Sequence, residues 1–199
     1  MISAQKVYKF FIKNSNKEYI CGSKLSENEK YLPKVIRYWW YDIPIKQTFL
    51  LRCVRKGINM VLNLLPKRVS YIDINRKRCD VYYGYAYWVI SMECARFVLK
   101  VLQNNKKLYW YFLFSYAPIE LYPHTIIFNS KYGAKAVRIK KYGEADCMAY
   151  APLHYVSYGI NGSNILVEED FEILKKSSKL FCQKVDSLIS KDLIKKLRK

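Results

Sequence analysis

The sequence has few of the residues that build metal sites, and it has no long hydrophobic run. Only two histidines occur in 199 residues, His124 and His154, and none of the six cysteines forms a Cys-x-x-Cys pair. These spacings do not fit a structural zinc site, so no metal is expected. No uncharged apolar stretch reaches the roughly eighteen residues of a membrane-spanning helix. No signal peptide is recognisable either, so we expect a cytoplasmic protein, either free or peripheral at the membrane. Several cysteines lie in apolar runs, which is typical of reduced, buried thiols.

Acidic residues are scarce relative to basic ones. Sixteen Asp and Glu stand against 35 Lys and Arg, which gives a formal net charge of +19 at pH 7. Such an excess permits nucleic acid, an anionic membrane surface or phosphorylated substrates as partners. The basic residues are spread along the whole chain, so an ordinary solvated surface explains them equally well. No nucleic-acid-binding motif is present, and no nucleic-acid partner is expected.

Hydrophobic residues make up 51% of the chain, which is enough for one folded domain over residues 1–199. Apolar periodicity and capping residues predict both element types, and a strand that runs into a helix at Ser91 resembles a βα junction. We therefore expect an α/β fold in which a central mixed sheet is flanked by helices. Helices are expected over 2–16, 44–68, 92–105, 117–130, 167–181 and 190–199, strands over 17–22, 69–75, 80–90 and 135–143, and a loop over 143–164.

Basic and apolar residues alternate in the expected helix over 44–68. One interpretation is a helix that lies on a membrane surface, because an amphipathic basic helix suits an anionic bilayer. The other, which we favour from sequence alone, is an ordinary helix that covers a sheet.

A single carboxylate, Glu120, lies in the apolar and aromatic segment 115–130. Pro118 suits the first turn of a helix there, whereas Pro123 is expected to kink or break it. Glu120 is either a favourable first-turn acid or a working acid. Among aromatic neighbours, burial would raise its pKa toward the working range of a catalytic base.

Three stretches in order resemble one family, the core-2/I-branching β-1,6-N-acetylglucosaminyltransferases, which include the peptide xylosyltransferases (glycosyltransferase family 14). They are GYAYWVIS at 84–91, APIELYPHTIIFNS at 117–130 and DFEILKKSSKLFCQKVD at 170–186. A fainter likeness covers 1–20. The chain resembles the C-terminal part of the family's GT-A-like catalytic domain, and the resemblance implies that the N-terminal nucleotide-binding half is missing.

The resemblance also implies roles for five residues in an inverting, metal-independent transfer of N-acetylglucosamine or xylose from a UDP-sugar to a saccharide. Glu120 matches the family's general base. Lys184 matches the lysine that faces the donor diphosphate. Lys34 and Arg37 match an acceptor-binding Lys-x-x-Arg, and Tyr142 matches a tyrosine of the same pocket. One base with nearby cations suits transfer, because a nucleoside diphosphate leaves without a protonating acid.

Several positions depart from the family pattern. Ile119 stands where the family has an aspartate, Tyr85 where it has a serine, and Asn161 where it has an arginine that shares the diphosphate. Pro123 interrupts the helix of the base. With the missing half, these departures predict that the chain alone does not transfer sugar. Two alternatives stay open from the charge: a module that binds single-stranded nucleic acid, and a peripheral membrane protein.

Overall fold

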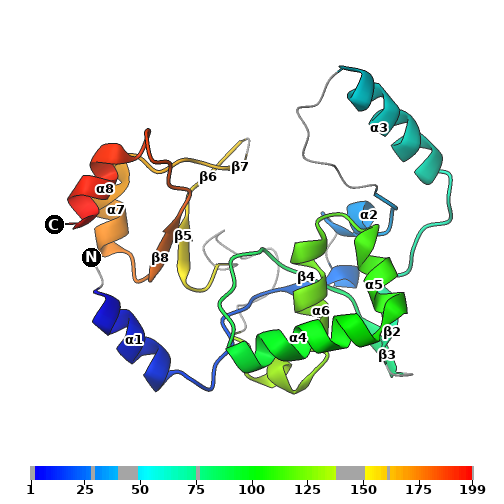
Figure 1. Ribbon diagram of the computed structural model, residues 1–199, viewed down its shortest axis with the longest axis horizontal. Coiled ribbons are helices and arrows are strands. Elements are labelled where there is room, and N and C mark those ends of the chain that lie inside the picture. Colours follow the sequence, from blue (N-terminus) through cyan, green and yellow to red (C-terminus); the bar gives the residue numbers. More distant parts are fainter. Residues whose placement is uncertain are drawn as a thin grey trace. The chain divides into compact units, whose positions relative to one another are not determined.

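The computed structural model describes residues 3–27, 30–39, 49–74, 77–137, 151–160 and 162–198 (Figure 1). The chain divides into two compact units. Unit 1 comprises Met1–Cys21, Tyr87–Ser91 and Lys135–Lys199, and unit 2 comprises Gly22–Ala86 and Met92–Ala134. The expectation of a single domain over 1–199 stays a prediction.

Unit 2 holds helices together with two small antiparallel sheets. Its elements are β1 (Ser23–Lys24), the 3-10 turn η1 (Leu25–Glu27), α2 (Leu32–Val35), α3 (Phe49–Leu62), β2 (Tyr71–Ile74), β3 (Lys77–Asp80), β4 (Tyr82–Tyr83), α4 (Met92–Asn104), α5 (Lys106–Leu113), the 3-10 turn η2 (Pro118–Glu120), α6 (Tyr122–Phe128) and the 3-10 turn η3 (Lys131–Ala134). Strand β1 pairs with β4, and β2 pairs with β3 in a hairpin whose Ile72 and Cys79 oppose each other and are both buried.

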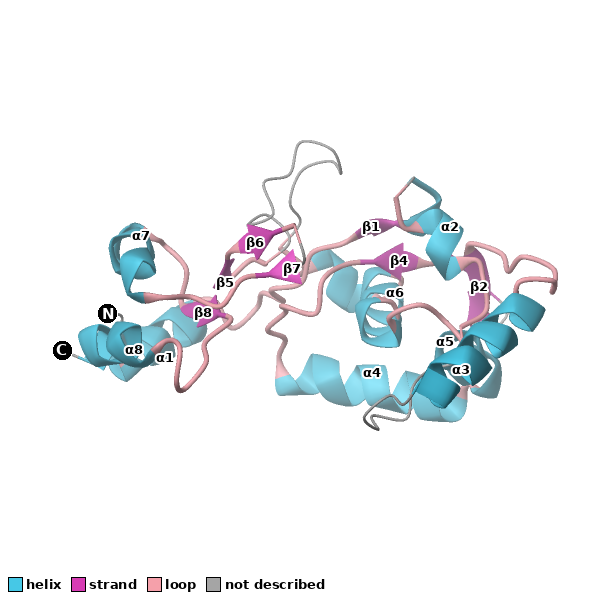
Figure 2. Cartoon of the chain, turned by 90° about the horizontal axis from the view of Figure 1, so that it is seen from above, coloured by secondary structure: helices cyan, strands magenta, loops and turns pink. Residues whose placement is uncertain are grey.

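Helix α6 is the centre of unit 2. Every residue from Pro123 to Phe128 is buried, and the helix packs against α4 and β4. Figure 2 shows the β1–β4 pair beside it. The Thr125 hydroxyl accepts a hydrogen bond from the Tyr82 N–H at 3.0 Å, which joins helix to strand. Pro123, Ile126, Ile127 and Phe128 make most of this helix apolar, and the buried Thr125 has the hydrogen-bond partner that a buried polar group needs.

The segment around Glu120 breaks where the prolines predict. The turn η2 begins at Pro118 and ends at Glu120, and α6 begins two residues later with Pro123 in its first turn. A proline in a helix interior would remove an amide donor and crowd a carbonyl, whereas the first turn has no need of that donor. The predicted break is therefore confirmed, and Glu120 lies at the junction of two short helical pieces.

Unit 1 contains α1 (Ala4–Lys13), β5 (His154–Val156), β6 (Tyr158–Gly159), β7 (Gly162–Ser163), the 3-10 turn η5 (Glu168–Asp170), α7 (Phe171–Lys176), β8 (Phe181–Gln183) and α8 (Lys191–Arg198). Strands β5 and β8 are parallel, and β6 and β7 are antiparallel. The core of this unit includes Leu153, Val156, Leu166 and Leu193. Two isolated bridges tie the segment near Tyr19 to Ala136 and Val89.

The mixture of helices and sheets expected from the sequence is confirmed. In the described part of the chain, however, the strands pair only two by two, so the single central sheet of a GT-A-like fold stays a prediction. Strands β5, β6 and β7 lie within the expected loop 143–164, so that expectation is wrong over these residues. None of the described helices has the length and apolar character needed to cross a bilayer.

Candidate functional site

The backbone holds Glu120 from both sides. Its N–H donates to the Ala117 carbonyl at 2.9 Å, and its own carbonyl accepts from the Gly84 N–H at 3.0 Å. Ala117 adopts a left-handed conformation with φ of 46°, which is uncommon for a residue with a side chain. Such a backbone conformation persists only where the surrounding structure stabilises it, and it is found more often at functional sites than elsewhere.

The side-chain partner of Glu120 is Tyr83. Its hydroxyl donates to the carboxylate at 2.5 Å, and the Tyr83 ring is only 3% exposed. Burial raises the pKa of Glu120 above its ordinary value, and the Tyr83 hydrogen bond opposes this effect by stabilising the carboxylate. Burial and the neighbouring Glu120 charge raise the pKa of Tyr83, so the phenol keeps its proton. The hydrogen bond from the Tyr83 hydroxyl therefore fixes the orientation of the Glu120 carboxylate.

An aromatic cluster, defined as Tyr31, Tyr83 and Tyr85, lies beside this carboxylate. The Tyr31 and Tyr83 rings are stacked with centroids 4.0 Å apart and 19° between their planes. Tyr85 meets Tyr83 edge to face at 6.4 Å, and its hydroxyl lies 3.4 Å from that of Tyr31. Tyr85 stands where the resembled family has a serine, and its ring is part of this cluster.

Of Lys34 and Arg37, the two predicted acceptor residues that the structure describes, Lys34 contacts the aromatic cluster. Its Nζ lies 5.5 Å from the centroid of the Tyr31 ring and 5.4 Å from that of Tyr116, both within cation–π range. The structure therefore links Lys34 to Glu120 through two stacked rings. Helix α2 carries Lys34 in its last turn, and the side chain is exposed.

The other predicted site residues are placed differently. Arg37 is exposed, accepts a hydrogen bond from Arg68 through its carbonyl at 2.9 Å, and lines a pocket of about 320 Å³. Lys184 belongs to unit 1, where its carbonyl accepts from the Leu166 N–H at 2.8 Å. Its expected position opposite Glu120 stays a prediction, because the two residues lie in different units. Tyr142 and Asn161 are outside the described residues.

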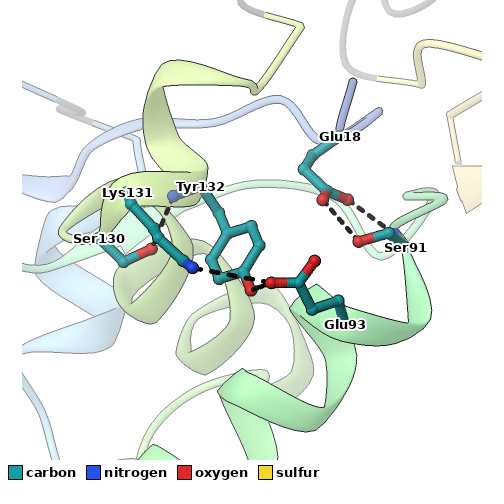
Figure 3. A network of polar contacts seen from close by, with 6 residues as sticks. All are labelled: Glu18, Ser91, Glu93, Ser130, Lys131 and Tyr132. Carbon is teal, nitrogen blue, oxygen red and sulfur yellow. Dashed lines mark hydrogen bonds and ion pairs between the residues drawn. The ribbon is translucent and has the colours of Figure 1, made fainter. Parts of the chain in front are cut away.

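Two further acids have structural partners (Figure 3). Glu18 is 2% exposed and accepts from both the N–H and the hydroxyl of Ser91, each at 2.7 Å. Glu93, in the first turn of α4, accepts from the Tyr132 hydroxyl at 2.7 Å and lies 3.6 Å from the Lys131 Nζ. The bonds from Ser91 stabilise the buried Glu18 carboxylate. These bonds explain its burial without a catalytic role.

No group of three or more His, Cys, Asp or Glu residues in the described ranges is arranged to hold a metal ion. Metal-independent chemistry stays a prediction.

Sequence reasoning missed Arg68, a cation of unit 2 with four side-chain hydrogen bonds. Its guanidinium donates to the carbonyls of Val35, Arg37 and Tyr111 and to the Ser115 hydroxyl, at 2.5 to 2.9 Å. It also lies against the Tyr111 ring. Burial lowers the pKa of this guanidinium. Arg68 follows a proline and a lysine in a basic stretch, where no local pattern distinguishes it.

Comparison with known proteins adds no relative. No family model matches the chain, and no curated protein matches it significantly in sequence. The likeness to the core-2/I-branching family therefore stays a prediction that depends on its motifs.

Proposed function

We propose that the chain takes part in an inverting, metal-independent transfer of N-acetylglucosamine or xylose from a UDP-sugar to a saccharide, with Glu120 as the general base. The observation that carries this proposal is the carboxylate of Glu120, which is half-buried, has a raised pKa and is oriented by Tyr83. The Tyr83 ring stacks on the Tyr31 ring, which lies within cation–π range of Lys34.

The chemistry of the transfer requires such a group. A sugar hydroxyl is a poor nucleophile at neutral pH, so a base must accept its proton as the hydroxyl attacks the anomeric carbon. A base works best when its pKa approaches the operating pH, and burial moves the pKa of Glu120 in that direction. The bond from Tyr83 fixes the orientation of the carboxylate without removing its charge.

The aromatic cluster and Lys34 suit the binding of the acceptor saccharide. Binding sites for small molecules combine apolar and aromatic surfaces with a few placed polar groups. Here Tyr31 and Tyr83 are buried, so the partly exposed Tyr85 supplies the ring, and the exposed Lys34 supplies a donor within 5.5 Å of the Tyr31 centroid. Lys184 is proposed to face the donor diphosphate as a point charge, as the family resemblance implies.

Saccharide binding tests the proposal on the purified chain. Saturation-transfer NMR is carried out with a panel of neutral oligosaccharides, and dissociation constants are measured for those that bind. Because Lys34 is expected to contact the acceptor, Lys34→Gln should weaken binding about tenfold, the equivalent of one lost polar contact of about 1.4 kcal/mol. The matched control is Lys100→Gln on α4, an exposed lysine of the same unit, which should leave binding unchanged.

Glu120→Gln separates the role of base from that of binding. The amide retains the shape of the side chain and an acceptor for Tyr83, so saccharide binding should stay within about twofold of the wild type. Because the chain alone is predicted not to transfer sugar, transfer is measured with the missing nucleotide-binding half supplied by a second chain and with a UDP-sugar added. Under these conditions transfer to the bound saccharide should be roughly 10²- to 10⁴-fold slower with this variant than with the wild type, the usual contribution of a general base. If no oligosaccharide binds, or if both lysine variants bind equally well, the proposal is wrong.

A further inference from the structure

Helix α3 exposes almost all of its apolar side chains. None of its residues is buried. Phe49, Leu50 and Met60 are 83%, 71% and 72% exposed, and Val61 is 63% exposed. The interpretation favoured from sequence, a helix that covers a sheet, is therefore wrong for α3. Isolated apolar side chains are common on protein surfaces, but a continuous exposed apolar helix face marks an interaction site.

The two sides of α3 differ in what they contact. Arg55, Ile58, Asn59 and Leu62 are partly covered, and their three- and four-residue spacing places them on one side of the helix. The opposite side carries the exposed apolar residues, which are Phe49, Leu50, Cys53, Val54, Met60 and Val61. The exposed side is thus apolar along the whole length of α3.

Positive charge borders this apolar side, and no acid accompanies it. Arg52 and Lys56 are exposed and lie one helical turn apart on the edge of the apolar side. No Asp or Glu occurs anywhere from residue 43 to residue 72, although six Lys and Arg do. Helix α3 itself carries three of them, Arg52, Arg55 and Lys56. Basic residues beside the apolar face of an amphipathic helix are attracted to anionic lipid headgroups.

We propose that α3 lies in the interface of an anionic lipid bilayer, with Phe49, Leu50 and Met60 among the acyl chains and with Arg52 and Lys56 at the headgroups. A helix of 14 residues is about 21 Å long, which is shorter than the roughly 30 Å hydrocarbon core, so α3 lies along the surface instead of spanning it. Long cationic side chains keep their charge in water while their stems cover apolar surface.

The charge pattern favours lipid over a second copy of the chain. In a dimer built on this face, Arg52 and Lys56 of the two copies would border the same interface without any acid between residues 43 and 72 to compensate them. An anionic bilayer supplies that compensation at every position. The proposal does not depend on the sugar-transfer function and goes beyond it.

Vesicle sedimentation tests this proposal with the full-length chain. Vesicles of phosphatidylcholine alone are compared with vesicles in which part of the phosphatidylcholine is replaced by phosphatidylserine. We expect the chain to sediment with the anionic vesicles, and added salt should release it. Arg52→Glu with Lys56→Glu should reduce the partition coefficient by at least about 25-fold, because each of the two cations near the surface contributes about fivefold and a charge reversal removes more than that.

Matched controls separate α3 from the general charge of the protein. Lys9→Glu with Lys13→Glu changes the charge equally at two exposed positions with the same spacing, on α1. Leu188→Asp, at a leucine that is 82% exposed in unit 1, is the control for Leu50→Asp on α3. The α3 variants should lose binding and the control variants should keep it.

Two results would overturn the proposal. One is equal loss of binding in the α3 variants and their controls, which would assign vesicle binding to net charge alone. The other is a wild-type chain that stays in the supernatant but forms dimers in sedimentation equilibrium that Leu50→Asp dissociates. That result would assign the apolar side of α3 to self-association.

Discussion

Replacing Arg68 by alanine is expected to destabilise unit 2 more than any exposed substitution. Its guanidinium makes four hydrogen bonds that join α2, the residues after it, α5 and Ser115. Charge-assisted bonds contribute about 1.5 kcal/mol each at the low end. The lowered pKa of Arg68 shows that burial of the charge offsets part of that gain. If burial of the charge offsets about half of the summed contribution of the four bonds, Arg68→Ala lowers the free energy of unfolding by roughly 3 kcal/mol.

Urea denaturation followed by tryptophan fluorescence measures this loss, because Trp39 and Trp110 both lie in unit 2. A loss of about 3 kcal/mol would lower the urea midpoint by roughly 1 M or more. Arg68→Lys should fall between wild type and alanine, because an ammonium cannot reproduce the four bonds of the planar fork. Lys67→Ala, at the exposed neighbouring position, should change stability by less than about 0.5 kcal/mol. A loss below about 1 kcal/mol for Arg68→Ala would refute the reasoning.

Three further predictions concern the surroundings of Glu120. Because burial raises the pKa of Glu120, the folded state favours the protonated carboxyl. The stability that the protonated carboxyl contributes is lost as pH rises through the folded-state pKa. Glu120→Gln should therefore raise the melting temperature at neutral pH, with a gain that disappears under acidic conditions; a gain that is independent of pH would contradict this. Tyr83→Phe removes a bond that stabilises the carboxylate, so the pKa of Glu120 measured by NMR titration should rise further, and an unchanged value would be inconsistent with the bond. Gly22→Ala should lower the free energy of unfolding by about 1–3 kcal/mol, measured by chemical denaturation. The reason is that a Cβ at this position would lie 2.8 Å from the Tyr83 carbonyl oxygen and 3.0 Å from His124 Cδ2. Unchanged stability would show that the backbone adjusts freely.

Elements with local signals were predictable from the sequence. Ser3 caps α1, and its hydroxyl accepts from the Lys6 N–H as a capping residue should. The break near Pro123 follows from the geometry of the ring. Helix α4 begins and ends within a residue of its predicted bounds. In each case the information lies within a few residues of the element.

Elements that depend on distant partners were not predictable. Strands β5 and β8 are three residues each and exist because they pair across more than twenty residues. Helix α5 was missed because its sequence, KKLYWYFL, is rich in aromatic residues that also favour strands. A signal was present: Asn105 caps this helix by accepting from the Leu108 N–H at 3.0 Å.

The candidate site also combines a residue with a local sequence signal and partners that are distant in the sequence. Glu120 stands out in the sequence as a lone acid in an apolar segment, and its role as a base, which the family resemblance implies, stays a prediction. Its partner Tyr83 is 37 residues away in the chain. Nineteen tyrosines occur in the sequence, and none is distinguished by its neighbours alone. The link from Glu120 through Tyr83 and Tyr31 to Lys34 therefore required the structure.

The most direct test of the central claim is a ¹³C NMR titration of the Glu120 carboxyl, assigned with Glu120→Gln and repeated with a saccharide that binds. The account predicts a midpoint above that of an ordinary glutamate, because burial disfavours the charged form. It also predicts that the midpoint shifts when the saccharide is bound, because the acceptor hydroxyl then contacts the carboxylate. An ordinary midpoint that no saccharide changes would contradict the claim that Glu120 is a base at a sugar-binding site.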